Sequence, residues 1–338
     1  MKTTPPRFRT GQQTYVADRC QPLINAVQQG KLNLVALARE GYPGQPLRRS
    51  ELPGVLSIGS WNAMGTQDWG LTTHCNEGIE LTYLETGAMP FRVNNRRHTL
   101  KPGSLTITRP WQPHSLGNPT IGAGKLHWLI LDVGVKRPHQ SWAWPKWFVM
   151  TRSDLKRLTT LLRQNETAVW NAERYVASCF RRIDEVTQSP ARALTISRLA
   201  VLINDLFLSL FDMLTRRRIS LRPELTSTQR TVELFLNHLK EEPERVSQEW
   251  TSEAMAQHCD MGVTHFTELC RKLTNMTPMQ YLTYWRVEVA AQRLTTHPEQ
   301  RVTDIAFACG FHSSQYFATV FKKLKGCSPK QYRHDSLR

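Results

Sequence analysis

Three side chains in the N-terminal half have the chemistry and spacing of a binding site. His74 and Glu80 lie six positions apart with Asn76 between them, and His114 follows on a later segment. Two imidazoles and a carboxylate can coordinate a divalent metal ion. The same groups can instead hydrogen-bond a small organic molecule, or they can serve the structure alone. The residues themselves leave all three alternatives open.

Aromatic residues accompany this group. Trp111 precedes His114 in a short Pro-rich run, and the pair His127–Trp128 lies further along the chain. Their ring faces and N–H donors suit a small polar ligand such as a sugar. Isolated tryptophans are also common core residues, so this feature does not decide between a ligand and a core.

Residues 256 to 332 contain an internal repeat. The twelve residues from Cys270 to Tyr281 match those from Phe321 to Tyr332 with five identities. Upstream, Ala256 and Ala306 each stand three residues before a cysteine. A small residue at that position lets two helices approach closely, so the repeat predicts two helix-turn-helix units, each followed by a short closing helix.

The turn inside each unit needs a residue that tolerates positive φ. Gly310 provides it in the second copy, and Asp260 occupies the equivalent position in the first. Aspartate adopts this conformation more readily than most residues, so both turns are expected to form. Cys259 and Cys309, which precede these positions, are interpreted as small core residues.

The residues around the first candidate site form short apolar runs separated by Gly and Pro. This pattern predicts a small β-barrel or jelly roll. The expected strands are 32–38, 55–58, 79–84, 91–93, 104–108 and 126–131. Helical periodicity follows at 153–164, 166–187 and 191–216.

A charged segment with Pro223 separates these elements from the repeat and predicts an interdomain linker. Beyond it, helices are expected at 228–239, 252–259, 264–273 and 278–294, followed by the second copy at 303–324. The expected class is therefore α+β. The predicted domains are a β-barrel over 1–150, a helical connector over 151–216, a linker over 217–226 and an all-helical domain over 227–335.

Composition places the chain among soluble proteins of the cytoplasm. It has 338 residues, 40% of them apolar, and seven cysteines without a Cys-x-x-Cys pair, which favours reduced thiols over a zinc module. Met1 to Gly30 lacks the apolar run of a secretory signal. Leu199 to Leu214 is apolar but is expected to be too short to span a membrane.

The net charge of +16 invites a nucleic-acid interpretation but is unevenly distributed. Residues 227 to 338 hold 14 basic and 12 acidic residues, so most of the excess lies in the first 226 residues. Local charge is more informative, because Ser313 to Gly326 carries Lys322, Lys323 and Lys325 with no acidic residue. The basic N-terminal part can serve DNA, an anionic ligand or solubility.

The C-terminal motif resembles the signature of AraC/XylS-type transcription regulators. It runs Ile305-Ala306-x3-Gly310-Phe311-x4-Tyr316-Phe317-x3-Phe321-Lys322-Lys323-x2-Gly326-x-Ser328-Pro329-x-Gln331-Tyr332-Arg333. The resemblance covers about 110 residues. It implies two recognition helices in successive major-groove faces of double-stranded DNA, joined by the helix 278–294. It also implies contact with RNA polymerase, and activation rather than repression.

Carried over to this sequence, the resemblance assigns the DNA-facing residues. Exposed positions early in the recognition helices would contact bases: Thr264, His265, Thr267 and Glu268 in the first, Ser314, Gln315, Ala318 and Thr319 in the second. Gln can bond adenine, Glu can accept from cytosine, and Thr can contact the thymine methyl. Later positions would contact phosphates: Arg271, Lys272, Lys322 and Lys323. Glu268 departs from the family, which often has Arg there.

The N-terminal group resembles the metal motifs of cupins. His74-x-Asn76-x3-Glu80-x6-Gly87 and Gly103-x10-His114 match them, except that Asn76 replaces the usual second His. AraC-type sensor domains resemble cupins and generally bind an organic effector without a metal. The resemblance thus implies a metal-free effector site, with no cofactor, lined by His74, Asn76, Glu80, Trp111 and His114.

The helix at 191–216 is apolar on most of its circumference, more than one packed face requires, which suggests a homodimer. Together these features predict an effector-controlled transcription regulator and not an enzyme. Two alternatives remain: a metal-dependent cupin enzyme with an accessory helical domain, and a constitutive DNA-binding protein whose barrel only dimerises.

The two copies of the repeat are unequal. The second has Gly310 and its lysine cluster, while the first has Asp260 and Glu268. We therefore expect the second copy to attract phosphates more strongly, and the first to depend on particular base contacts.

Overall fold

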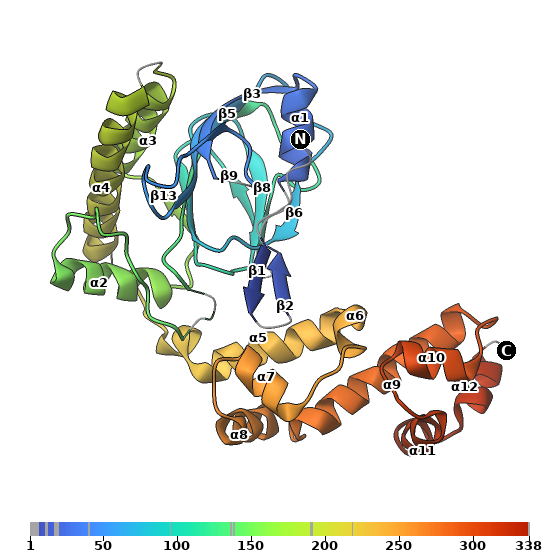
Figure 1. Ribbon diagram of the computed structural model, residues 1–338. Helices are drawn as coiled ribbons and strands as arrows, with labels where there is room; N and C mark the ends of the chain where they lie inside the picture. The colour runs from blue at the N-terminus through green and yellow to red at the C-terminus, as the bar shows by residue number, and fades with distance from the viewer. Residues whose placement is uncertain are drawn as a thin grey trace. The chain divides into compact units, whose positions relative to one another are not determined.

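The computed structural model describes residues 7–10, 13–16, 20–39, 41–94, 96–135, 137, 139–189, 192–217 and 219–336. The chain divides into two compact units, Met1–Thr226 and Ser227–Arg338. We call them the N-terminal and C-terminal units. Figure 1 shows them, with labels on the helices and on some of the strands.

Two sheets form the body of the N-terminal unit. A seven-stranded sheet has the order β13-β10-β7-β12-β5-β3-β4, and a four-stranded sheet has the order β6-β11-β8-β9. All neighbours are antiparallel except β3 and β4. The strands of the larger sheet are β3 Leu32–Ala38, β4 Gln45–Pro46, β5 Val55–Ala63, β7 Ile79–Leu84, β10 Ser104–Thr108, β12 Gly124–Leu131 and β13 Val169–Asn171. Those of the smaller are β6 Leu71–His74, β8 Met89–Val93, β9 Arg96–Leu100 and β11 His114–Leu116. A separate hairpin pairs β1 Arg7–Thr10 with β2 Gln13–Val16.

The central strand β12 is buried on both faces. Leu129 and Leu131 belong to a core shared with the connector helices. Trp128 and Ile130 belong to a second core, together with residues of β8, β9 and β11 from the other sheet. Alternate side chains of a strand point to opposite faces, so each face of β12 closes a different core. The second core is the interior of the barrel.

In the described part of the N-terminal unit, four helices accompany the sheets. The first, α1 Gln21–Gln28, buries Leu23 and Ala26 in the barrel-interior core. The connector helices are α2 Arg152–Arg163, α3 Arg174–Thr187 and α4 Arg192–Arg216. The Thr151 hydroxyl caps α2 by accepting from the amide of Asp154. Figure 1 shows α3 and α4 running side by side, and α3 contacts β3, β5 and β12.

Two expectations for the connector are wrong. The helix expected from residue 166 begins only at Arg174, because Val169–Asn171 instead pairs with β10 at the sheet edge. The second wrong expectation is that the apolar segment is too short to span a membrane. By length and composition alone, Leu194–Arg216 is long and apolar enough to do so. Within the protein, however, α4 buries Leu199, Leu206 and Leu210 fully in the shared core, which accounts for its apolar character.

The C-terminal unit is helical throughout its described residues. A 3-10 turn, η1 Pro223–Thr226, precedes it. Its helices are α5 Thr228–Glu241, α6 Pro243–Val246, α7 Ser252–His258, α8 Val263–Thr274, α9 Pro278–Thr296, α10 Val302–Ala308, α11 Ser314–Lys325 and α12 Pro329–Ser336. Thr277 and Gln280 form a capping box at the start of α9, where Pro278 occupies the first turn. The sheet-rich and all-helical halves confirm the α+β class.

The two helix-turn-helix copies, α7–α8 and α10–α11, have the same backbone conformation at matching points. Asp260 and Gly310 in the turns have φ of 56° and 83°, as predicted. Asn275 and Gly326, which end α8 and α11, have φ of 59° and 79°. Ala256 and Ala306 are 1% and 0% exposed, and they belong to two separate cores. Helix α9 serves both, because Leu282 belongs to the first core and Val287 to the second.

Candidate DNA-binding surface and ligand site

The exposed residues early in α8 and α11 occupy equivalent places. Thr264, His265 and Glu268 are exposed on α8 and Thr267 is half-buried, whereas Phe266 and Cys270 are buried. On α11, Gln315 and Thr319 are exposed, and Ser314 and Ala318 are half-buried. Each helix therefore turns an apolar face to its own core and presents a polar face with hydrogen-bonding groups.

Local contacts hold some of these side chains. The Ser313 hydroxyl, which caps α11, donates to Oε1 of Gln315 at 3.0 Å. This contact leaves the amide N–H₂ group of Gln315 available as a donor pair. On the first copy, Nε2 of His265 lies 3.3 Å from the hydroxyl of Thr228 on α5. The two copies thus present different groups on similar backbones.

Tyr316 is a candidate contact that sequence reasoning missed. Its side chain is 57% exposed, and it stands where His265 stands in the first copy, one residue before the buried phenylalanine. Its place in the repeat could have identified it. Its aromatic ring alone does not distinguish a contact residue from a core residue.

Four basic residues follow on the exposed later turns of the two helices: Arg271, Lys272, Lys322 and Lys323. Lys325 differs from them. Its ammonium lies 2.8 Å from Oε2 of Glu288 on α9, so the expectation of a lysine cluster without acidic partners is wrong for this residue. The acidic partner is distant in sequence and close in space. The second copy therefore offers two exposed lysines, matching Arg271 and Lys272 in the first.

Four of the five residues predicted for the N-terminal site, His74, Asn76, Glu80 and His114, gather at the barrel interior. Nε2 of His114 lies 2.7 Å from Oε2 of Glu80, and the amide of Asn76 donates to the same oxygen at 3.0 Å. The His74 ring stands 4.4 Å from that of His114, centroid to centroid. His114 and Asn76 are nearly inaccessible to solvent, at 3% and 2% exposure.

The charge of Glu80 is retained inside this cluster. Burial alone would raise its pKa, but His114, His74 and the Thr108 hydroxyl together hold the pKa of the carboxyl below its ordinary value. Among the described residues, no hydrogen-bond donor reaches Oδ1 of Asn76, although this atom is buried. A buried carbonyl oxygen without a donor is uncommon and calls for a bound molecule or water.

The donors do not fit a metal centre. No group of three His, Cys, Asp or Glu residues within the described ranges could hold a metal ion. Nε2 of His114, the ring nitrogen left for a metal, is instead directed at Oε2 of Glu80 at 2.7 Å, and the amide of Asn76 donates to the same oxygen. The geometry suits a hydrogen-bonding network.

Trp111 lies apart from this network. Its indole N–H donates to the carbonyl of Val135 at 2.7 Å, while its backbone amide donates to the carbonyl of Asn76 at 2.8 Å. It supports the loop next to the cluster and contacts Asn76 through its backbone.

Further polar groups on the inward faces of the strands were missed. Thr82 and Thr106 form a hydroxyl pair, and the Trp128 indole donates to the Ser57 hydroxyl at 2.8 Å. Strand register places Thr82 opposite both Thr106 and Trp128, and Glu80 opposite Thr108. The period-two alternation of β7 could have identified Thr82, because it lies two residues from Glu80 and so shares its face.

Comparison with known proteins follows the same division of the chain. Residues 255–335 match a helix-turn-helix domain and residues 65–131 match a cupin domain. These ranges contain the two helix-turn-helix copies from within α7 onward and the barrel strands from β6 to β12.

Proteins of similar sequence include transcriptional activators. The HTH-type transcriptional activator RhaS of Escherichia coli (strain SE11) is 30% identical over 128 residues, which are 38% of this chain and 44% of that protein. Over this relative, the match thus spans less than half its length. RhaS of Enterobacter sp. (strain 638) is 25% identical over 269 residues, 77% of this chain and 86% of that protein.

Among solved structures, a DNA-binding transcriptional dual regulator of Escherichia coli K-12 is 25% identical, covering 32% of this chain and 98% of that chain with a TM-score of 0.27. The sequence matches at both ends agree with the two-copy motif and the barrel described above. The chain is thus similar to AraC-type transcription regulators such as RhaS, with a helix-turn-helix domain at its C-terminal end and a cupin domain in its N-terminal part.

Proposed function

We propose that this chain is a sequence-specific DNA-binding transcription activator of the cytoplasm, controlled by a small-molecule effector. One observation carries the proposal: α8 and α11 each expose polar side chains early and two basic side chains later on one face. Early residues would read base edges and later ones would neutralise phosphates. The assigned base contacts are Thr264, His265, Thr267 and Glu268 on α8 and Ser314, Gln315, Ala318 and Thr319 on α11.

Binding of the full chain to duplex DNA from its own upstream region tests this proposal. Affinity should fall steeply as salt rises, because neutralised phosphates release counterions. A binding constant that is independent of both salt and sequence would contradict it. Stimulation of transcription by purified RNA polymerase from the same duplex tests the activator role and the polymerase contact.

The effector would bind at the barrel interior, at His74, Asn76, Glu80 and His114, with Trp111 holding the adjacent loop. The free Oδ1 of Asn76 and the ionised Glu80 accept hydrogen bonds, and the threonine hydroxyls of β7 and β10 both donate and accept. Such a surface favours a ligand rich in hydroxyl groups, so sugars are the first class to test. The effector can shift DNA binding only by preferring one arrangement of the protein.

A thermal-shift screen with sugars and small organic acids tests the effector. A sugar should raise the melting temperature of the wild type but not that of Asn76→Leu, which removes the free oxygen. Stabilisation by no compound would favour a constitutive DNA-binding protein. Tightly held iron, manganese or zinc, lost in His114→Ala together with a catalytic turnover, would favour the cupin enzyme.

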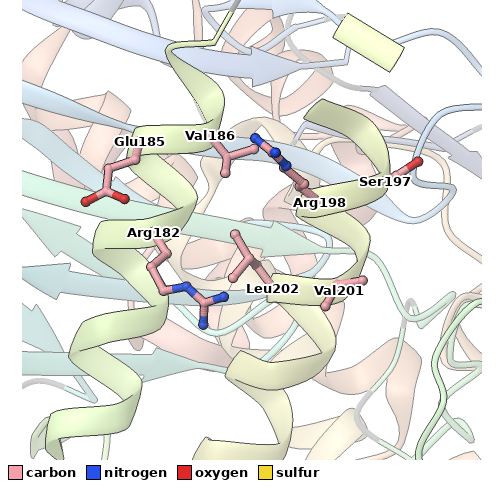
Figure 2. A pocket seen from close by; sticks show the side chains of 7 residues that line it. All are labelled: Arg182, Glu185, Val186, Ser197, Arg198, Val201 and Leu202. Carbon is pink, nitrogen blue, oxygen red and sulfur yellow. The ribbon is translucent and has the colours of Figure 1, made fainter. Parts of the chain in front are cut away.

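We also propose a homodimer through α4. Three apolar side chains spaced by seven residues remain exposed on this helix: Leu194 at 51%, Val201 at 67% and Leu208 at 43%. They form one stripe, and Val201 of this stripe lines a groove of about 400 Å³ between α3 and α4 (Figure 2). Arg198 and Asp205 lie on the same stripe. In an antiparallel pair of such helices, Arg198 of one copy would face Asp205 of the other, which gives charge complementarity.

A further inference from the structure

Helix α9 is shared by both helix-turn-helix copies, and Arg286 lies where its two cores meet. Four residues before it, Leu282 packs in the first core, and directly after it Val287 packs in the second. Arg286 is itself only 9% exposed. Burial of a charged guanidinium is costly unless its N–H groups find hydrogen-bond acceptors. The acceptors of Arg286 therefore indicate its role.

Its partners belong to the first copy's side of the helix. Nε of Arg286 donates to the carbonyl of Val246 at 3.0 Å, and Nη2 donates to that of Gln248 at 2.8 Å. Val246 ends α6, and Gln248 lies in the connection from α6 to α7. The Ser247 hydroxyl donates to the carbonyl of Glu244, and the Trp250 indole to that of Arg245, so this connection is itself held in place.

The second copy approaches the same guanidinium through its turn. A Cβ added to Gly310 would lie 2.7 Å from the carbonyl oxygen of Ser247 and 2.9 Å from Nη2 of Arg286. The backbone at Gly310 therefore packs directly against both groups. Burial lowers the pKa of Arg286, and Cys309, Glu249 and Tyr316 oppose that shift, so residues of both copies surround it.

This contact explains an inequality between the copies. A positive φ does not by itself require glycine, because Asp260 adopts one in the first turn. The second turn has glycine because a side chain there would also collide with Arg286 and Ser247. At Gly326, by contrast, φ is 79° and a Cβ would meet nothing within 4 Å.

We propose that Arg286 and Gly310, with the carbonyls of Val246 and Gln248, form a joint that fixes α8 and α11 relative to each other. Arg286 is then a positioning residue, and it sets the number of base pairs between the two DNA segments that the copies read. This inference rests on the proposed DNA-binding function. The α9 helix alone joins the copies along the chain; the joint adds a second connection beside it.

The test uses duplexes that the full chain selects from a random DNA library. Thr267→Ala and Gln315→Ala identify the segments read by α8 and α11. One base pair is then inserted or removed between these segments. For the wild type, each change should reduce affinity by about tenfold or more, because one set of base contacts is lost.

Arg286→Met keeps the volume of the side chain and removes its donors. We expect the affinities of this variant for the different spacings to differ by less than about threefold, while its base preferences within each segment stay unchanged. Gly310→Ala should act in the same direction. Gly326→Ala, at a similar φ in open space, and Gln292→Met, on the exposed side of α9, are the matched controls and should keep the wild-type spacing preference.

A folded Arg286→Met that keeps the wild-type spacing preference would overturn the proposal. If that variant does not fold, Arg286→Lys and Gly310→Asp are measured instead, and the loss of folding in all three would assign the joint to folding and not to positioning. Wild-type protein that selects no duplex would contradict the proposed function itself. In that case there is no selected duplex from which to build the spacing series. This outcome therefore differs from a failure of the proposal about Arg286 and Gly310, which requires a selected duplex.

Discussion

Nε2 of His114 on β11 and Oε2 of Glu80 on β7 lie 2.7 Å apart and connect the two sheets of the barrel. The contact is buried, and Asn76 and Thr108 donate to the same carboxylate. A single ionised side chain thus links the loop before β7, a neighbouring strand and the opposite sheet.

We expect Glu80→Gln to destabilise the N-terminal unit by about 1–3 kcal/mol at neutral pH, because buried donors lose a charged acceptor. The pKa of Glu80 is below its ordinary value of 4.5, so its contribution is complete above that pH and is lost as pH falls through the lowered pKa. The difference in free energy of unfolding between wild type and variant, measured by denaturant titration, should therefore shrink on acidification. Glu185→Gln on the exposed side of α3 is the control. A difference that does not change down to the acid transition would contradict the ionised state of Glu80.

His258 predicts a second pH dependence, in the C-terminal unit. It packs against Phe235 and Trp250, and burial lowers its pKa to about 4 from an ordinary 6.5. Since the unfolded chain binds the proton more readily, stability is complete above pH 6.5 and falls between 6.5 and 4, by at most about 1.4 kcal/mol per pH unit. His258→Phe should remove this slope, as followed by thermal melting of the full chain. An unchanged slope would assign it to other groups.

Base contacts and phosphate contacts should respond differently to substitution. Gln315→Ala should cost about 1–3 kcal/mol on the preferred site and relax selectivity at one base step. Lys322→Ala should weaken binding to all sites about equally and reduce the salt slope by about one. Titrations of preferred and mismatched duplexes at several salt concentrations measure both. Equal behaviour of the two variants would refute the division of roles.

Lys325 provides a contrast within the same helix. Because its ammonium pairs with Glu288 at 2.8 Å, Lys325→Met should leave the salt slope of DNA binding unchanged. Lys323→Met, two residues earlier and exposed, should lower that slope by about one. If Lys325→Met lowers it equally, the pair with Glu288 opens when DNA binds.

Dimer formation through α4 should depend on the exposed apolar stripe. Val201→Asp introduces a charge at a side chain that is 67% exposed, so it should leave the fold of the monomer intact and shift sedimentation at micromolar concentration towards the monomer. Met64→Asp, at 78% exposure on the barrel, should not. Wild-type protein that sediments as a monomer would rule out this interface at such concentrations.

Local patterns predicted much of the architecture. The strands Ile79–Leu84 and Ser104–Thr108 have the expected bounds, as does Leu32–Ala38, because short apolar runs end at Gly or Pro. Both turns of the repeat have the predicted positive φ, because that property depends on one residue and its neighbours.

Contacts between distant residues were harder to predict. Val169–Asn171 forms a strand only because β10, more than 60 residues earlier, offers an open edge. The pairing of Lys325 with Glu288 and the crowding at Gly310 arise from helix packing, which single-residue preferences do not encode. For the ligand cluster, the spacing of His74, Glu80 and His114 identified the residues, whereas only the fold reveals that they bond to one another.

The burial of β12 on both faces has a mechanical consequence. Trp128 and Ile130 lie on the same face as Glu80 of the His74–Glu80–His114 cluster, while Leu129 and Leu131 face the core that holds α3 and α4. A molecule that displaces β12 from inside the barrel also displaces the residues that pack against the connector helices, because neighbouring residues of this strand belong to the two different cores. Because close-packed cores change between discrete arrangements and resist gradual deformation, the connector would respond to an effector in one concerted step.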